Sequence, residues 1–188
     1  MIFSSSTFRF QINQYREVSV RLLFFESCLA TGAIVDTKND FLDEFLKQYK
    51  KTSSPIQKEL GPESLRQSVL NVLNGMTAVF EKKDPLLQAR ASVVIYYLLF
   101  RSAIKSNRLA SISRRGLVAF VDKVERNRET AEKDLPKADF ALLECNRLFI
   151  QGTNDASSTR ERLRIIAEIF MIEPNYGHKG VQKMTQTS

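Results

Sequence analysis

Residues 93–100 are apolar at every position, and this segment constrains the fold more than any other part of the chain. A helix that is apolar on all sides is buried at the centre of a protein or crosses a membrane. The segment is flanked by Arg90 and Arg101 and is shorter than the roughly 18 residues that a membrane span needs. We therefore predict a buried central helix that begins at Asp84-Pro85 and ends near Ser106.

The remaining segments also favour helices. Apolar residues recur at helical spacing in stretches near 14–31, 40–49, 63–82, 113–133, 136–150 and 157–172, with no convincing strand pair between them. Phe8, Phe10 and Ile12 alternate as in a strand, but a single short strand has no partner. We predict an all-α fold, one irregular bundle of about seven helices around the central helix. Its parts are an N-terminal segment (1–13), the helical domain (14–172) and a disordered tail (173–188).

The stretch 151–158 joins the last two predicted helices through Gln151, Gly152, Thr153, Asn154 and Asp155. Gly after an apolar-periodic segment is typical of a left-handed helix end, and Asn and Asp favour turns. Any of Asp155, Ser157 and Ser158 can cap the following helix, and Ser158 with Glu161 fits a capping box. Two interpretations stay open: the turn only shapes the corner, or it contributes side chains to a site. In the helix that follows, we expect Arg160, Arg162 and Arg164 to face solvent.

The chain is basic, with a net charge of +7, which permits contact with nucleic acid or another polyanion. Ser113 resembles a helix N-cap, and Arg114 and Arg115 follow in the first turn, where positive charge is unfavourable. Solvent can screen that repulsion, or an anion or an acidic surface can lie there. Arg126 and Arg128 stand further along the same helix in a mixed-charge run. These four arginines are the candidate nucleic-acid or anion contacts.

The sequence lacks the residues of common catalytic and metal sites. Its one histidine, His178, lies in the tail, so the helical body has no histidine for a nucleophile pair or a zinc site. We predict no catalytic residue, no metal site and no cofactor, and we expect no enzymatic activity from this chain alone. Cys28 and Cys145 are far apart on apolar faces, which favours buried reduced thiols and hence a cytoplasmic, non-membrane protein.

Several segments, read in order along the chain, resemble one known family. They are Arg-x-x-x-x-Arg-Leu-Leu-Phe-Phe (16–25), Phe-Leu-Asp-Glu-Phe-Leu (41–46), Asp-Pro (84–85), Tyr-Tyr-Leu-Leu-Phe-Arg (96–101), residues 120–128 and Gln-Gly-Thr-Asn-Asp (151–155). Together they cover most of residues 14–172. This ordered set resembles the helical C-terminal portion of the N-terminal domain of GmrSD-type restriction proteins.

The resemblance implies a function in bacterial phage defence. Proteins of this ParB-like family carry a mixed α/β catalytic part with an Asp-Gly-x-x-Arg motif, then a helical bundle, and often an HNH nuclease domain. They are linked to nucleotide-dependent restriction of modified DNA. This chain has neither the Asp-Gly-x-x-Arg motif nor an HNH histidine, so no catalytic residue carries over. The implied role is a non-catalytic helical accessory module that supports a ParB-like catalytic domain or subunit.

The residues also leave open that the chain works independently. A basic helical domain can bind DNA or RNA by itself, with an affinity that falls steeply as salt rises. It can equally be a protein-interaction domain without nucleic-acid contact.

Overall fold

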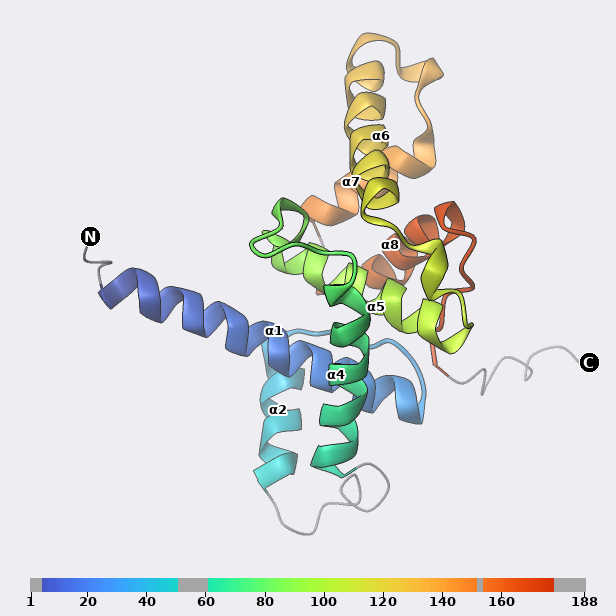
Figure 1. The fold of residues 1–188 in the computed structure, drawn as a ribbon. Coiled ribbons are helices and arrows are strands. Elements are labelled where there is room, and N and C mark those ends of the chain that lie inside the picture. Colours follow the sequence, from blue (N-terminus) through green and yellow to red (C-terminus); the bar gives the residue numbers. More distant parts are fainter. Residues whose placement is uncertain (1–4, 51–60, 152–153, 178–188) are drawn as a thin grey trace, which may run out of the picture.

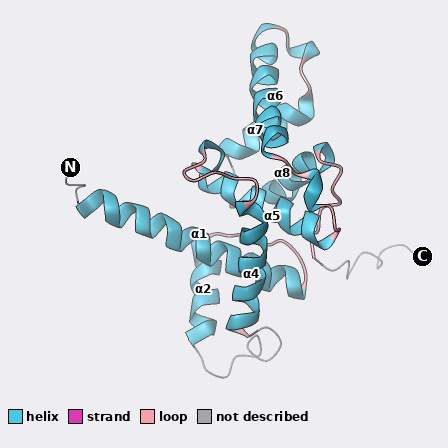
Figure 2. Cartoon of the chain, viewed as in Figure 1, coloured by secondary structure: helices cyan, strands magenta, loops and turns pink. Residues whose placement is uncertain are grey.

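The computed structural model describes residues 5–50, 61–151 and 154–177, with side chains from Arg16 onward apart from Thr31, Tyr49 and Lys50. These residues form seven α-helices and no strand (Figures 1 and 2), which confirms the all-α prediction. In order, the helices are α1 (Ser5–Thr31), α2 (Asn39–Lys50), α4 (Pro62–Thr77), α5 (Arg90–Lys105), α6 (Arg114–Lys133), α7 (Phe140–Ile150) and α8 (Ala156–Ile169), with short 3-10 helices at η1 (Pro85–Leu87), η2 (Leu109–Ser111) and η3 (Leu135–Lys137).

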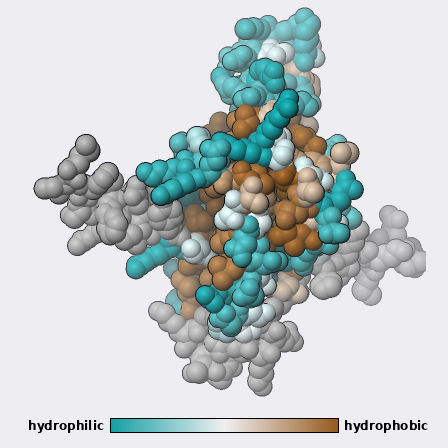
Figure 3. Space-filling model, in the orientation of Figure 1, coloured by the Kyte–Doolittle hydropathy of each residue, from teal (hydrophilic) through white to brown (hydrophobic). Residues whose placement is uncertain are grey.

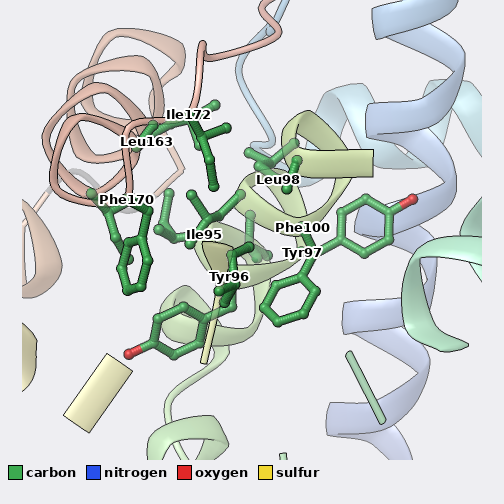
Figure 4. Close-up of a cluster of buried hydrophobic side chains, with 14 of the residues drawn as sticks. Ile95, Tyr96, Tyr97, Leu98, Phe100, Leu163, Phe170 and Ile172 are labelled. Carbon is green, nitrogen blue, oxygen red and sulfur yellow. The ribbon is translucent and has the colours of Figure 1, made fainter. Parts of the chain in front are cut away.

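Helix α5 is the central helix that the apolar segment predicts. All of its residues from 94 to 103 are buried, and Ile95, Leu99 and Phe100 are 0 % exposed. The helix packs against α1, α4 and α8, and Figure 4 shows its side chains among those of α8 and the segment after it. Full burial of one such side chain contributes about 1.5–3 kcal/mol, so this helix supplies much of the stability of the fold.

The predicted boundary between an N-terminal segment (1–13) and the helical domain is wrong. Helix α1 begins at Ser5, so most of the segment 1–13, with its strand-like alternation, belongs to a helix rather than to a separate part. A lone strand leaves its backbone N–H and C=O groups unpaired, whereas a helix pairs them within the segment. The alternation of three apolar residues is a weaker determinant than this requirement.

The connection between α4 and α5 also differs from the prediction of two adjoining helices. Helix α4 ends at Thr77, and η1 and a bend precede α5. Asp84 organises this connection, because its carboxylate accepts hydrogen bonds from the backbone N–H of Leu86 (3.0 Å) and of Glu81 (3.0 Å). The side chain is buried, so a local turn becomes part of the packed body.

The predicted disordered tail begins too early. Residues 173–177 pack on the body, where the Asn175 N–H donates to Ser102 Oγ at 3.0 Å and Arg101 donates to Asn175 Oδ1 at 2.9 Å. Gly177 has φ +99°, and a Cβ there would lie 1.9 Å from the Gly32 carbonyl oxygen. The hydrogen bonds of Asn175 hold residues 173–177 against α5. Residues 178–188 of the predicted tail lie outside the described residues.

One arginine of α8 faces the core instead of solvent. Arg160 and Arg164 are exposed as predicted, but Arg162 is 0 % exposed. It follows Thr159 by three residues and precedes Ile166 by four, and both of those are buried. Position on the helix therefore decides its burial, and residue type alone gives the wrong answer.

Helices α6 and α7 form a hairpin whose outer half projects from the rest of the molecule (Figure 1). The buried residues of α6 are Leu117 and Phe120, both in its first half. Asn127 fastens the outer part, because its side chain donates to the Asp139 carbonyl at 2.9 Å and accepts from the Asp139 N–H at 2.7 Å. In Figure 3, hydrophobic side chains gather over α5, and hydrophilic ones cover the outer part of α6.

Candidate functional site

Arg21 is the centre of a polar junction that joins α1, the loop before α2 and the turn before α8. It is 7 % exposed, and its Nη1 donates to the Thr37 carbonyl at 3.0 Å and to the Thr37 hydroxyl at 2.8 Å. The same nitrogen lies 2.6 Å from Asn154 Oδ1. The guanidinium thus ties α1 to the turn before α8, since Arg21 and Asn154 are 133 residues apart in sequence.

The turn before α8 is fixed from outside rather than by its own residues. The Thr37 N–H donates to the Asn154 carbonyl at 2.8 Å, and Asp36 Oδ1 accepts from the Ala156 N–H at 2.8 Å. Asp155 stands at the N-cap position but makes no side-chain cap hydrogen bond. The capping box predicted at Ser158 is wrong, because α8 already begins at Ala156 and Asp36 supplies the cap.

The charges around this turn complement each other. The Ala156 N–H first, and then the Lys38 ammonium, hold the pKa of Asp36 below its usual value. Lys38 lies 3.2 Å from Asp36 Oδ2 and 3.3 Å from Asp155 Oδ1, and these carboxylates raise its pKa. Both ion pairs are exposed, so their contribution to stability is small.

Of the five turn residues singled out in the sequence, the structure brings two into the junction. Asn154 binds Arg21, and Asp155 pairs with Lys38. Gln151 is exposed, and Gly152 and Thr153 lie outside the described residues. The contacts of Asn154 and Asp155 favour the interpretation that the turn shapes the corner.

A hollow of about 130 Å³ adjoins the junction and is lined by Glu17, Arg21, Thr37, Arg90, Ala91, Val94 and Asn154. Glu17 lies between the two arginines: one carboxylate oxygen is 2.9 Å from Arg21 Nη2, and the other pairs with Arg90. Both carboxylate oxygens are therefore occupied, and no side chain of this hollow is arranged as an acid, base or nucleophile.

A second polar cluster is buried under α5 and was not anticipated from the sequence. Glu26 Oε1 accepts from the Tyr97 hydroxyl at 2.6 Å and from Arg101 Nε at 2.7 Å. Burial, and then the Glu26 carboxylate, raise the pKa of Tyr97 strongly. A signal was present, because Glu26 falls between Phe25 and Leu29 in an apolar-periodic segment, and a charged residue there requires a partner.

Ser113 caps α6 as predicted, with its hydroxyl accepting from the Gly116 N–H at 3.1 Å. Arg114, in the first turn, meets an acidic surface of the same chain: Nε lies 2.9 Å from Glu81 Oε1, and Nη1 lies 3.0 Å from Asp84 Oδ2. Burial opposes ionisation of Asp84, but the N–H groups that it accepts and the Arg114 charge outweigh burial and keep its pKa low. The intramolecular carboxylates explain why an arginine is stable at this helix start.

The other three candidate arginines differ in their surroundings. Arg128 pairs with Glu125 (2.6 Å) and with Glu132, and Arg126 donates to the Asp122 carbonyl at 3.2 Å. Arg115 is exposed and has no hydrogen bond or ion pair with any described residue. The structure therefore does not gather the four arginines into one uncompensated basic site, and their contact with nucleic acid stays a prediction.

The thiols are poor nucleophiles. Neither Cys28 nor Cys145 forms a disulfide, and burial raises the pKa of Cys28 to about 11 and that of Cys145 to about 12. In the part of the chain that the structure describes, no three His, Cys, Asp or Glu side chains come together as metal ligands. The helices described there also include none long and apolar enough to span a membrane.

Comparisons with protein-family models, with curated proteins and with solved structures find no match for this chain.

Proposed function

We propose that this chain is a non-catalytic helical module that docks a ParB-like catalytic domain or subunit in nucleotide-dependent DNA restriction. The observation that carries the proposal is the bond between Arg21 and Asn154 at 2.6 Å. These residues belong to two of the segments on which the family resemblance rests, the stretch 16–25 and the turn 151–155. Segments that resemble the family separately thus form one junction.

A second contact supports the same proposal. Arg101, the last residue of the resembling stretch 96–101, binds Glu26 at 2.7 Å, one residue beyond the stretch 16–25. The Arg101–Glu26 contact is buried and the Arg21–Asn154 contact is partly buried, and both fasten α1 to other segments of the chain. A supporting module needs residues that stabilise its fold and does not need catalytic residues, and these contacts fit that role.

The alternative of an independent nucleic-acid-binding domain has less support. Arg114 and Arg128 are paired with carboxylates of the same chain, and Arg126 binds a backbone carbonyl. Phosphate contacts need cations that are available to the backbone of the nucleic acid. Among the four, only Arg115 and Arg126 lack a carboxylate partner within the described residues.

The α6–α7 hairpin is the surface we assign to the partner. Leu135, the first residue of η3, is 52 % exposed, and Phe140, the first residue of α7, is 66 % exposed. The two bonds between Asn127 and Asp139 hold this end in one conformation, which lowers the entropic cost of binding. Exposed apolar side chains on a rigid projection suit a protein partner better than a polyanion.

The test is calorimetric titration of the chain with a purified ParB-like catalytic domain of a GmrSD-type protein. We expect saturable binding, weakened at least about tenfold by the double substitution Leu135→Glu and Phe140→Glu, as for central interface residues. Phe41→Glu is the matched control, because Phe41 is 50 % exposed on α2, away from the hairpin. Absence of binding, or equal weakening by the control, contradicts the proposal.

A further inference from the structure

A solvent-open pocket of about 260 Å³ lies where the start of α5 meets α6 and α7. It is separate from the junction around Arg21 and from the hairpin end that carries Leu135 and Phe140. Its lining residues are Ala89, Ser92, Tyr96, Phe120, Val121, Val124, Glu125, Asn146 and Phe149.

The walls of this pocket are mainly apolar and partly aromatic. Phe120 is buried, Phe149 and Val124 are half-buried, and Val121 is 40 % exposed at the rim. Two phenyl rings and two valines form a surface suited to a flat apolar group.

Tyr96 brings a hydroxyl to this pocket. The residue is 2 % exposed and its ring packs on Phe80, with the ring centroids 5.3 Å apart. In Figure 4 the hydroxyls of Tyr96 and Tyr97 point in opposite directions. No described residue binds the Tyr96 hydroxyl, whereas the hydroxyl of the neighbouring Tyr97 is satisfied by Glu26. The ring of Tyr96 is held in the core while its hydroxyl, which lines the pocket, is available to a ligand.

Two further polar side chains converge on the pocket. Ser92 and Asn146 are half-buried, and neither side chain is hydrogen-bonded to a described residue. The adjoining N-terminus of α5 has Ala89 as its N-cap residue and no side-chain cap, which leaves the positive end of the helix dipole open. Apolar walls with a few convergent polar groups are characteristic of small-molecule sites.

We propose that this pocket binds a small neutral aromatic molecule that carries one hydrogen-bonding group, such as an indole or a phenol. A dry cavity of about 150 Å³ accommodates benzene, so the larger space here fits one fused ring system. The aromatic walls contact the ring faces, and Tyr96 binds the polar group. Glu125 at the rim, already paired with Arg128, disfavours an anionic ligand. This inference does not depend on the proposed docking function.

Indole fluorescence provides a direct test, because the chain contains no Trp and so contributes no indole signal of its own. Indole excited beyond the tyrosine absorption is titrated with the full chain. We expect a saturable blue shift as indole leaves water. Tyr96→Phe keeps the ring and removes the hydroxyl, and loss of that one hydrogen bond should weaken binding about tenfold.

Val121→Arg places a charge at the rim and should abolish the shift. Val118→Arg is the matched control, since Val118 is 38 % exposed on the same helix and does not line the pocket, and it should bind indole like the unmodified chain. Circular dichroism of all three variants establishes that they are folded. The proposal is overturned if the unmodified chain gives no blue shift. It is also overturned if the folded Tyr96→Phe and Val121→Arg variants bind indole as tightly as the unmodified chain. If Val121→Arg instead weakens only the titration with the catalytic domain, the pocket holds a side chain of that partner and the small-molecule proposal is wrong.

Discussion

At the scale of single residues, the buried guanidinium of Arg21 determines how three segments meet. Replacing it by Ala removes its bonds to Thr37, Asn154 and Glu17 and leaves their polar atoms without this donor. Hydrogen bonds to a charged group contribute about 1.5–3 kcal/mol, so we expect Arg21→Ala to lower the free energy of unfolding by roughly that amount or more.

Urea unfolding checks the value, and Arg66→Ala is its control. Like Arg21, Arg66 pairs with a carboxylate of its own helix, that of Glu63, but the Arg66 side chain is 62 % exposed. Its loss should cost less than about 1 kcal/mol. Equal effects of the two substitutions would show that Arg21 is not a junction residue.

Asp84 gives a prediction about pH. Its pKa in the folded chain lies below its usual value, because backbone N–H groups and Arg114 outweigh the opposing effect of burial. The carboxylate of an unfolded chain has a pKa of about 3.9, so Asp84 stabilises the fold fully above that pH and progressively less as the pH falls below it. Asp84→Asn should make the acid side of the stability profile flatter.

The matched comparison is Asp43→Asn, which changes an exposed carboxylate on α2. Urea midpoints measured over a pH series should flatten for Asp84→Asn only. A parallel change in both variants would assign the acid dependence to net charge instead of to Asp84.

Residue-level prediction from the sequence succeeded for the apolar core side chains and failed for the buried charged residues Arg162 and Glu26. The apolar stretch 93–100 correctly indicated a buried helix. The burial of Arg162 was misjudged because residue type was given more weight than its position on the apolar face of α8. Glu26 was missed because its partners, Tyr97 and Arg101, lie on a distant segment. Those partners are not encoded in local spacing.

At the scale of elements, α8 illustrates a helix whose N-terminus is stabilised by a residue far away in sequence. Asp36 accepts from the Ala156 N–H at 2.8 Å across 120 residues, while Asp155 at the N-cap position makes no such bond. Loss of a helix cap costs about 0.5–2 kcal/mol. We expect Asp36→Ala to lower the urea midpoint of the chain, and Asp155→Ala to lower it less.

Chemical unfolding of the two variants distinguishes the tertiary cap from the local one. The reverse order, with Asp155→Ala the more damaging, would mean that α8 is capped locally as the sequence alone suggests. The sequence located the helix within one residue of its start, but the identity of the cap depends on how the loop 32–38 is placed.

At the scale of the whole molecule, the segment 173–177 connects the end of the described chain to its centre. It binds Arg101 and Ser102 of α5 through Asn175. A chain ended after Ile172 should therefore be less stable than one ended after Gly177, by about 1–3 kcal/mol for the polar groups left unsatisfied. Equal urea midpoints for the two truncated chains would show that the segment does not contribute.

The architecture followed from helical periodicity and one apolar segment, since these depend on local spacing. The candidate site did not, because the junction of Arg21 with Asn154 and the pocket at Tyr96 arise from contacts between segments far apart in sequence. The four candidate arginines were chosen from their type and position, whereas the carboxylate partners of Arg114 and Arg128 became evident only in the folded chain.

We propose that this chain acts through a protein partner rather than through DNA. Fluorescence titration of the purified chain with a labelled DNA duplex, at low and at near-physiological salt, tests it most directly. We expect weak binding at low salt that disappears at near-physiological salt, because Arg114 and Arg128 are already paired with carboxylates of the chain. Binding that survives near-physiological salt and is weakened by Arg115→Ala and Arg126→Ala would contradict it.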